Sequence, residues 1–220
     1  MQDLDAVIRA RRSVRGFLPD PVPRAILGEV FELAQRAPSN CNVQPWRVYV
    51  ASGERRERLR ARLVAAMRAG RPSPMGIPID VFEDEYRTRQ IECAAEMYGH
   101  MGVARGDTAE RLEAYVRNYA FFDAPHVAFV CMDASFGIGV ALDVGMYVEA
   151  LMLLLWSRGV ASCPQASLRA YEDLTREELG IPDEHRVLCG LSFGYEDPEV
   201  PANRTRQSRQ PVEQNVTFID

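Results

Sequence analysis

Residues 38–46 read PSNCNVQPW, in which two prolines bracket a run of small polar and amide side chains. Asn and Gln amides donate and accept hydrogen bonds in one plane, which matches the edge of a flat heterocycle. Upstream, residues 11–13 read RRS and place two guanidinium groups beside a hydroxyl, donors that suit a phosphate. Together the two motifs predict a site for a phosphorylated, flat, hydrogen-bonding cofactor, a description that fits flavin mononucleotide (FMN).

The composition is that of an ordinary globular protein without a nucleic-acid surface. The chain has 220 residues, 47% of them hydrophobic, which is enough for one large domain spanning 1–220. Its net charge is −5 and its pI about 5.4, which argue against general binding of nucleic acid. All 26 basic residues are Arg, so any anion site must use Arg, hydroxyls or backbone amides.

The cysteines and histidines predict neither a disulfide framework nor a metal centre. The five cysteines are scattered without a C-x-x-C pair, which is typical of a reducing compartment, and we expect a cytoplasmic protein. The three histidines are equally dispersed, so no metal is expected. The acidic N-terminus has no apolar signal-peptide core.

Hydrophobic patterning predicts alternating helices and strands. We expect helices at 3–12, 23–34, 54–69, 83–98, 107–119, 140–157 and 171–180. Strands are expected at 46–51, 126–132, 187–195 and, at the end of the chain, 216–218. No strand is followed by a complete G-x-G-x-x-G, which disfavours a Rossmann fold.

Two segments invite functional interpretation. Residues 70–106 combine a Pro- and Gly-rich loop with a charged helix, and form either a lid or binding loop over the active site or a passive surface excursion. The segment 140–157 is apolar on nearly every face, but Asp143 and Glu149 make a membrane span improbable. Such a helix is expected in a core or between subunits.

Five motifs together resemble the FMN-dependent nitroreductase family over essentially the whole chain. They are RRSVRGF (11–17), PSNCNVQPW (38–46), RNYAFFDAP (117–125), CPQAS (163–167) and RQSRQP (206–211). The resemblance implies an α+β fold with a central mixed, mostly antiparallel sheet flanked by helices. It also implies an intertwined homodimer with C-terminal exchange and two FMN sites between the subunits, with 140–157 at the dimer seam.

The resemblance assigns the flavin contacts by position and assigns no catalytic residue, because FMN N5 carries the hydride. It implies that Arg11 and Ser13 hold the phosphate and ribityl chain, with Arg12 at the ribityl or pyrimidine edge. Arg209 adds a phosphate contact, with Arg206 in the same motif. The other implied contacts are Asn118 near the pyrimidine, Pro164, Gln165, Ala166 and Ser167 along the ring, and Pro38, Ser39, Asn40, Asn42 and Gln44 from the partner subunit.

The implied activity is FMN-dependent reduction of nitroaromatic compounds by NADH or NADPH. One flavin face must serve both flat substrates in turn, which predicts ping-pong two-electron transfer. Quinone or enone reduction, reductive dehalogenation and a non-catalytic redox sensor remain as alternatives. We interpret Cys41 and Cys163 as packing residues, and Glu83, Tyr86 and Arg87 as a solvated helix face rather than substrate contacts.

Overall fold

A four-stranded sheet with strand order β1-β2-β4-β3 lies at the centre of the chain. The computed structural model describes residues 3–73 and 82–219. Its strands are β1 (Arg47–Ser52), β2 (His126–Asp133), β3 (Ala161–Gln165) and β4 (His185–Gly194). All three strand pairings are antiparallel, and a parallel bridge joins Ser13 to Ser162 at the β3 edge. The predicted α+β class with a mostly antiparallel sheet is confirmed.

Strand β2 explains how one sheet supports two cores. Successive side chains of a strand point to opposite faces. Ala128, Val130 and Met132 therefore pack with α2 and α6, while Val127 and Phe129 pack with α3 on the other face. Every residue from His126 to Met132 is buried, which accounts for the uninterrupted apolar run in the sequence.

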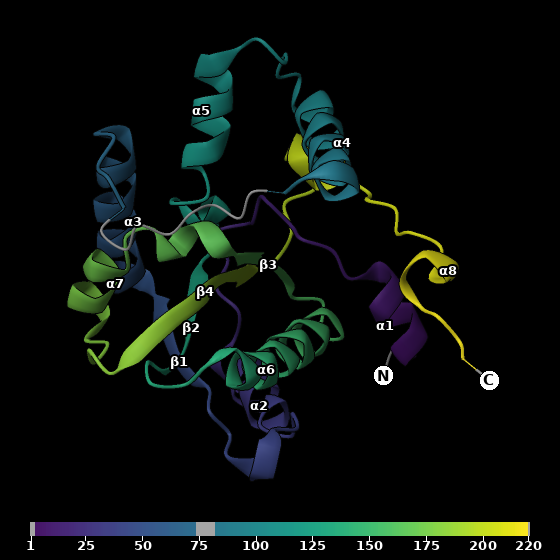
Figure 1. The fold of residues 1–220 in the computed structure, drawn as a ribbon. Helices are drawn as coiled ribbons and strands as arrows, with labels where there is room; N and C mark the ends of the chain where they lie inside the picture. The colour runs from purple at the N-terminus through teal and green to yellow at the C-terminus, as the bar shows by residue number, and fades with distance from the viewer. Residues whose placement is uncertain (1–2, 74–81, 220) are drawn as a thin grey trace.

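Helices cover both faces of the sheet and make three layers (Figure 1). Helices α2 and α6 lie on one face, and α3 and α7 lie on the other. The helices are α1 (Leu4–Ala10), α2 (Arg24–Ala34), α3 (Gly53–Arg68), α4 (Asp84–Met101), α5 (Thr108–Val116), α6 (Ile138–Trp156), α7 (Glu172–Leu179) and α8 (Val212–Asn215). Short 3-10 turns occur at Asn40–Asn42, Phe121–Asp123, Ala166–Arg169 and Pro201–Arg204.

Two parts of the chain stand away from the layered body (Figure 1). Helices α4 and α5 form a hairpin above the β3 end, and the last residues run past α1 to end far from the sheet. Helix α4 lies within the segment 70–106 that we expected to be an insertion, whereas α5 begins after it, at Thr108. Residues 74–81 of that segment lie outside the described residues.

Two strand predictions need correction. The predicted final strand at 216–218 is wrong in the single chain, because no described strand runs beside these residues. Strand β3 was missed because Pro164 interrupts its pattern; as an edge strand, β3 tolerates the missing N–H. The helix expected to reach 119 ends at Val116, and α4 runs on to Met101.

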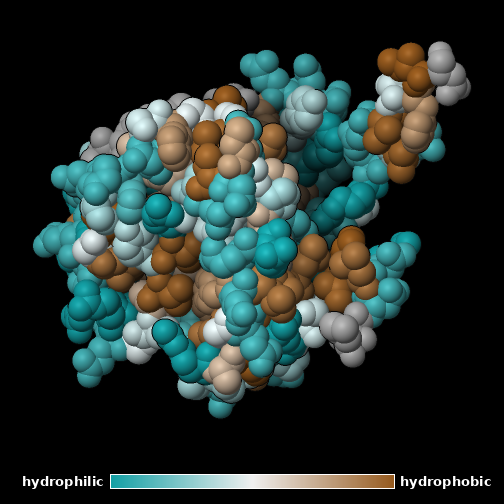
Figure 2. Space-filling view, turned by 90° about the horizontal axis from the view of Figure 1, so that it is seen from below, coloured by the Kyte–Doolittle hydropathy of each residue, from teal (hydrophilic) through white to brown (hydrophobic). Residues whose placement is uncertain are grey.

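Helix α6 has one buried face and one exposed face. Val144, Leu151 and Leu155 pack into the core, whereas Ile138 and Leu142 are 91% and 69% exposed. By length and composition α6 could cross a membrane, yet here it packs on the sheet as a core helix. Figure 2 views the molecule from the side of α2 and α6 and shows apolar surface over that face. The outer face of α6 is thus left uncovered by residues 3–73 and 82–219.

Candidate functional site

A groove of about 910 Å³ collects most of the positive charge predicted for the site. We call it the arginine groove. It lies between the end of α1, the N-terminal part of α4 and the segment 205–210. Its cations are Arg9, Arg11, Arg12, Arg15, Arg89, Arg206 and Arg209, and its acids are Glu92 and Glu149. The groove therefore unites Arg11, Arg12 and Ser13 with Arg206 and Arg209, which are distant in sequence.

The two adjacent arginines of the RRS motif have different surroundings. Arg11 lies at the groove wall, with its Nε 3.5 Å from a carboxylate oxygen of the half-exposed Glu149. Arg12 turns toward the body, where its guanidinium pairs with Glu196 at 2.5 Å and lies over the Trp156 ring at 5.1 Å. The Nε of Arg12 is buried and has no hydrogen-bond partner in the described chain.

Hydrogen bonds to backbone groups hold the C-terminal wall of the groove. Arg206 donates to the carbonyl oxygens of Asn203 and Thr205, and Arg209 donates to those of Gln207 and Ser208. From α4, Glu96 accepts a bond from the Arg206 N–H at 2.7 Å. The segment that carries the two arginines is thus fixed to α4.

A polar cluster lies where the RRS segment meets β3. The Val14 N–H donates to the Ser162 carbonyl at 3.1 Å, so the two segments run side by side. Gln165 donates from Nε2 to the Asn118 carbonyl at 2.8 Å, and Ser167 lies 3.3 Å from Asn118 Oδ1. Asn118, Gln165 and Ser167 are therefore brought together as expected.

Part of the outer edge of strand β3 is exposed beside that cluster. The Gln165 side chain is buried, and its amide is used internally by Asn118 and Ser192. Pro164 and Ala166 point the other way and are exposed. The segment of Ser13 and Val14 pairs with Ser162 on the outer side of β3, and Pro164 and Ala166 are the exposed residues beyond that bridge.

A smaller cavity of about 310 Å³ lies under α4 and adjoins the groove. It shares Arg15 and Cys93 with the groove and reaches Asn118 and Phe122. Its described lining contains no His, Asp or Glu, so it offers no carboxylate or imidazole for proton transfer. Its mostly apolar walls suit an aromatic ring.

The polar loop at 38–46 adopts an unusual backbone. Cys41, Asn42 and Gln44 have φ values of 48°, 56° and 47°. Left-handed conformations cost non-glycine residues roughly 1–2 kcal/mol each, although Asn tolerates them better. The Gln44 N–H donates to Ser39 Oγ and the Gln44 side chain donates to the Asn42 carbonyl, both at 3.0 Å. These bonds hold the loop in one shape.

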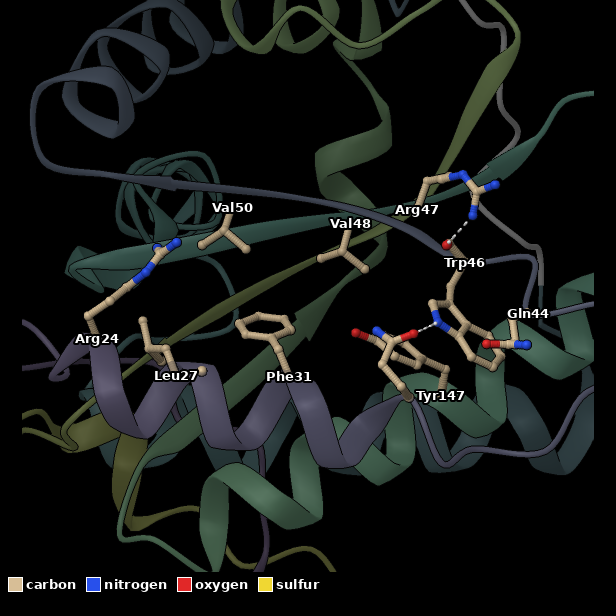
Figure 3. Close-up of a pocket in the computed structure, with 11 residues that line it drawn as sticks. Arg24, Leu27, Phe31, Gln44, Trp46, Arg47, Val48, Val50 and Tyr147 are labelled. Atoms are coloured by element: carbon tan, nitrogen blue, oxygen red, sulfur yellow. Dashed lines mark hydrogen bonds between the residues drawn. The ribbon is translucent and has the colours of Figure 1, made fainter.

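Within one chain the loop does not reach the arginine groove. None of the described residues that line the groove comes from 38–46. Pro38, Asn40, Asn42 and Gln44 are exposed, and Ser39 is half-buried. Gln44 instead lines a groove of about 620 Å³ between α2 and β1, which we call the edge groove (Figure 3). The structure thus separates the two motifs that the sequence had suggested belong to one cofactor.

The cysteine interpretation is half right. Cys163 is buried, and burial raises the pKa of its thiol to about 11, as expected of a packing residue. The interpretation of Cys41 as a packing residue is wrong within the single chain, because Cys41 is exposed. Glu83, Tyr86 and Arg87 are exposed, as expected of a solvated face. The described residues hold no cluster of three metal-ligating side chains.

Sequence reasoning missed several arginines of the groove. Arg15 lies two residues after Ser13 in an extended segment, so both side chains face one way, a signal present in the sequence. Arg9 and Arg89 gave no such signal, since only the packing of α1 and α4 brings them to the groove.

Known proteins resemble this chain over nearly its full length. The Nitroreductase family profile matches residues 8–195. Nitroreductase NfnB of Mycolicibacterium smegmatis is 38% identical over 99% of this chain and 93% of its own, and a 4-nitrobenzoate reductase of Nocardioides is 35% identical over 100% and 91%. The FMN-dependent nitroreductase NfnB of Mycobacterium smegmatis, solved with NADPH, superposes with a TM-score of 0.93 at 36% identity, covering 98% of this chain and 97% of that one. This chain belongs to the nitroreductase family.

Proposed function

We propose that this chain is an FMN-dependent NAD(P)H oxidoreductase that reduces nitroaromatic compounds. The observation that carries the proposal is the arginine groove, one wall of which includes Ser13, the residue that bridges to Ser162 of β3. Its volume of about 910 Å³ falls within the roughly 300–1,000 Å³ typical of cofactor sites. Family membership and the relatives' names support the same reading.

The residues present fit the phosphorylated end of FMN. Arg11, Ser13 and Arg209 would bind the phosphate, because guanidinium forks match phosphate oxygens and Arg11 lies at the groove wall. Arg206 would add charge to the same wall. Arg12 would offer only its unpaired Nε to the ribityl chain, since Glu196 and Trp156 hold the rest of its guanidinium.

The other end of the cofactor would lie along β3. Asn118 and Arg15 would face the pyrimidine edge, and Pro164, Gln165, Ala166 and Ser167 would line the ring, the exposed Pro164 and Ala166 in direct contact. When bound, FMN supplies two-electron chemistry, taking a hydride from NADH or NADPH and passing it to the acceptor. The protein's part is to hold the ring edge and to exclude water with the apolar cavity under α4.

We propose that the site is completed by a second copy of the chain. None of the loop residues Pro38, Ser39, Asn40, Asn42 and Gln44 lines the arginine groove of its own chain, and all but the half-buried Ser39 are exposed, so they would reach the partner's flavin. The exposed apolar face of α6, with Ile138 and Leu142, would form the seam. Obligate interfaces of this kind commonly bury about 2,000 Å² or more.

The C-terminal segment is proposed to cross to the partner. Phe218 and Ile219 are 82% and 90% exposed, and the tail ends away from its own sheet (Figure 1). β1 is an edge strand, and beside it the edge groove is lined by Val48, Val50 and Phe31 (Figure 3). A tail from the partner could pair with the open edge of β1 and bury its apolar side chains in the edge groove. Ending the chain at Gln210 should then weaken the dimer, and an unchanged dimer would exclude the exchange.

The chemical class of the electron acceptor is the most specific part of the proposal. The relatives include 4-nitrobenzoate reductases and a nitrobenzene nitroreductase, which favours nitroaromatics over quinones, enones or organohalides. The deciding experiment follows NADH and NADPH oxidation with each acceptor class in turn. Nitroarene-dependent turnover supports the proposal, whereas turnover with quinones alone, or bound flavin without turnover, favours an alternative.

We propose a cytoplasmic location, consistent with five unpaired cysteines.

A further inference from the structure

Asp143 is a buried carboxylate in the most apolar helix of the chain. It lies on α6 and is only 6% exposed. Its Oδ2 accepts a hydrogen bond from the Asn40 backbone N–H at 3.0 Å. Burying a carboxylate is costly unless its hydrogen bonds compensate. The burial of Asp143 therefore indicates that its hydrogen bond to Asn40, at the start of the polar loop, has a structural role.

The loop that Asp143 holds is strained and otherwise held mainly by its own bonds. Three of its residues have left-handed backbone, and two of these, Cys41 and Gln44, are types that seldom adopt it. The internal bonds of Gln44 fix the shape of the loop but not its position on the body. The Asn40–Asp143 bond ties that shape to α6.

A second contact from the same helix face fixes the far end of the loop. The Tyr147 ring stacks on Trp46 with centroids 4.8 Å apart and planes 17° apart (Figure 3). Trp46 also donates from Nε1 to Gln35 at 2.9 Å. Asp143 and Tyr147 are four residues apart, so they lie one turn apart on one helix face. The two side chains clamp the loop at both ends.

We propose that Asp143 is a positioning residue for flavin binding: it holds the loop 39–44 in the shape in which its side chains meet the partner's FMN. This inference rests on the proposed function, since it needs a flavin that the loop contacts. The outer face of α6 carries the proposed seam, so one helix would set both the approach of the partner and the shape of the loop that crosses to it.

The test compares three variants of the full-length protein. Asp143→Leu keeps the size of the side chain but removes the acceptor, and Asp143→Asn keeps an acceptor without the charge. Val144→Ala is the matched control, since the neighbouring Val144 is 1% exposed and has no bond to the loop. FMN affinity is measured by titrating apoprotein, and loop order by amide hydrogen exchange of residues 38–46 without FMN.

Asp143→Leu should weaken FMN binding about ten- to hundredfold, the loss expected for one hydrogen bond to a charged group. It should also speed exchange in residues 38–46, and Asp143→Asn should restore most of both properties. Val144→Ala should lower the melting temperature without changing either. If Asp143→Leu does not fold, Asp143→Ala removes the same acceptor with a smaller side chain.

Wild-type affinity and slow loop exchange in the Leu or Ala variant would overturn the inference. So would equal losses in Val144→Ala, because these would trace the effect to stability alone. A wild-type protein that binds no FMN would instead refute the proposed function, so the two failures are distinguishable.

Discussion

Arg11 and Arg12 are neighbours in the sequence but differ in what the fold places beside them. Arg11 faces the groove and meets the half-exposed Glu149, so it can turn to a phosphate at little cost. Arg12 is held by Glu196 and Trp156. The RRS motif predicted an anion site but could not show which of its two arginines is free to bind the anion. Both residues that hold Arg12 come from distant elements of the chain.

Arg11→Ala should weaken FMN binding about tenfold to a hundredfold, the loss of one or more charge-assisted hydrogen bonds. Retained flavin should keep its chemistry, since Arg11 lies away from the β3 edge. The measurement is FMN titration of apoprotein, followed by turnover at saturating FMN. Arg58→Ala, on the surface of α3, is the matched control. Equal affinities in both variants would place the phosphate elsewhere.

His126 should make stability depend on pH. Burial, helped by the nearby Arg56, lowers the pKa of His126 below its ordinary 6.5. Its Nε2 accepts the Val22 N–H at 2.9 Å, which also needs the neutral ring. Between the lowered pKa and about 6.5 the unfolded chain binds a proton that the folded chain does not, so the free energy of unfolding falls as pH falls.

Urea denaturation at several pH values would show this slope, and His126→Gln, which keeps an acceptor, should flatten it below about pH 6.5. The same slope in wild type and variant would assign the proton to another group.

At the scale of elements, the sequence predicted helices better than strands. The stripe of α2 and the apolar run of β2 are local patterns that tertiary packing reinforces. Strand β3 and the tail at 216–218 depend on partners far away in the chain or in another copy. No local pattern could therefore identify β3 despite Pro164, or show that the tail pairs with no strand in the described part of its own chain.

Leu142→Asp should dissociate the proposed dimer. Leu142 is 69% exposed on the outer face of α6, and a charge there would be buried at the seam. Light scattering should give about 24.8 kDa for the variant and twice that mass for wild type. Leu112→Asp on α5 is the control, because Leu112 is 47% exposed and lies outside the seam. A dimeric Leu142 variant would contradict this assignment of the seam.

At the scale of the molecule, each chain of the proposed dimer would supply halves of two different sites. The arginine groove and the β3 edge would form one half, and the loop 38–46, held to α6 by Asp143, would form the other. The sequence predicted both sets of residues, but not their separation, because motif order says nothing about which chain supplies each half. Only the resemblance to a dimeric family suggested it.

The apolar cavity of about 310 Å³ that reaches Asn118 should impose ping-pong kinetics. A nicotinamide and a nitroarene are both flat rings that would stack on the same exposed flavin face, so the donor product must leave before the acceptor binds. Double-reciprocal plots at several acceptor concentrations should be parallel. Intersecting lines would mean that donor and acceptor bind together.

The most direct test of the whole account is the titration of purified apoprotein with FMN, with binding monitored by the absorbance of the flavin. A cofactor site built from the arginine groove of one chain and the loop of another predicts saturation at about one FMN per chain, in a dimer. Two sites per dimer would match the two grooves. Folded protein that takes up no FMN at any concentration would contradict the account.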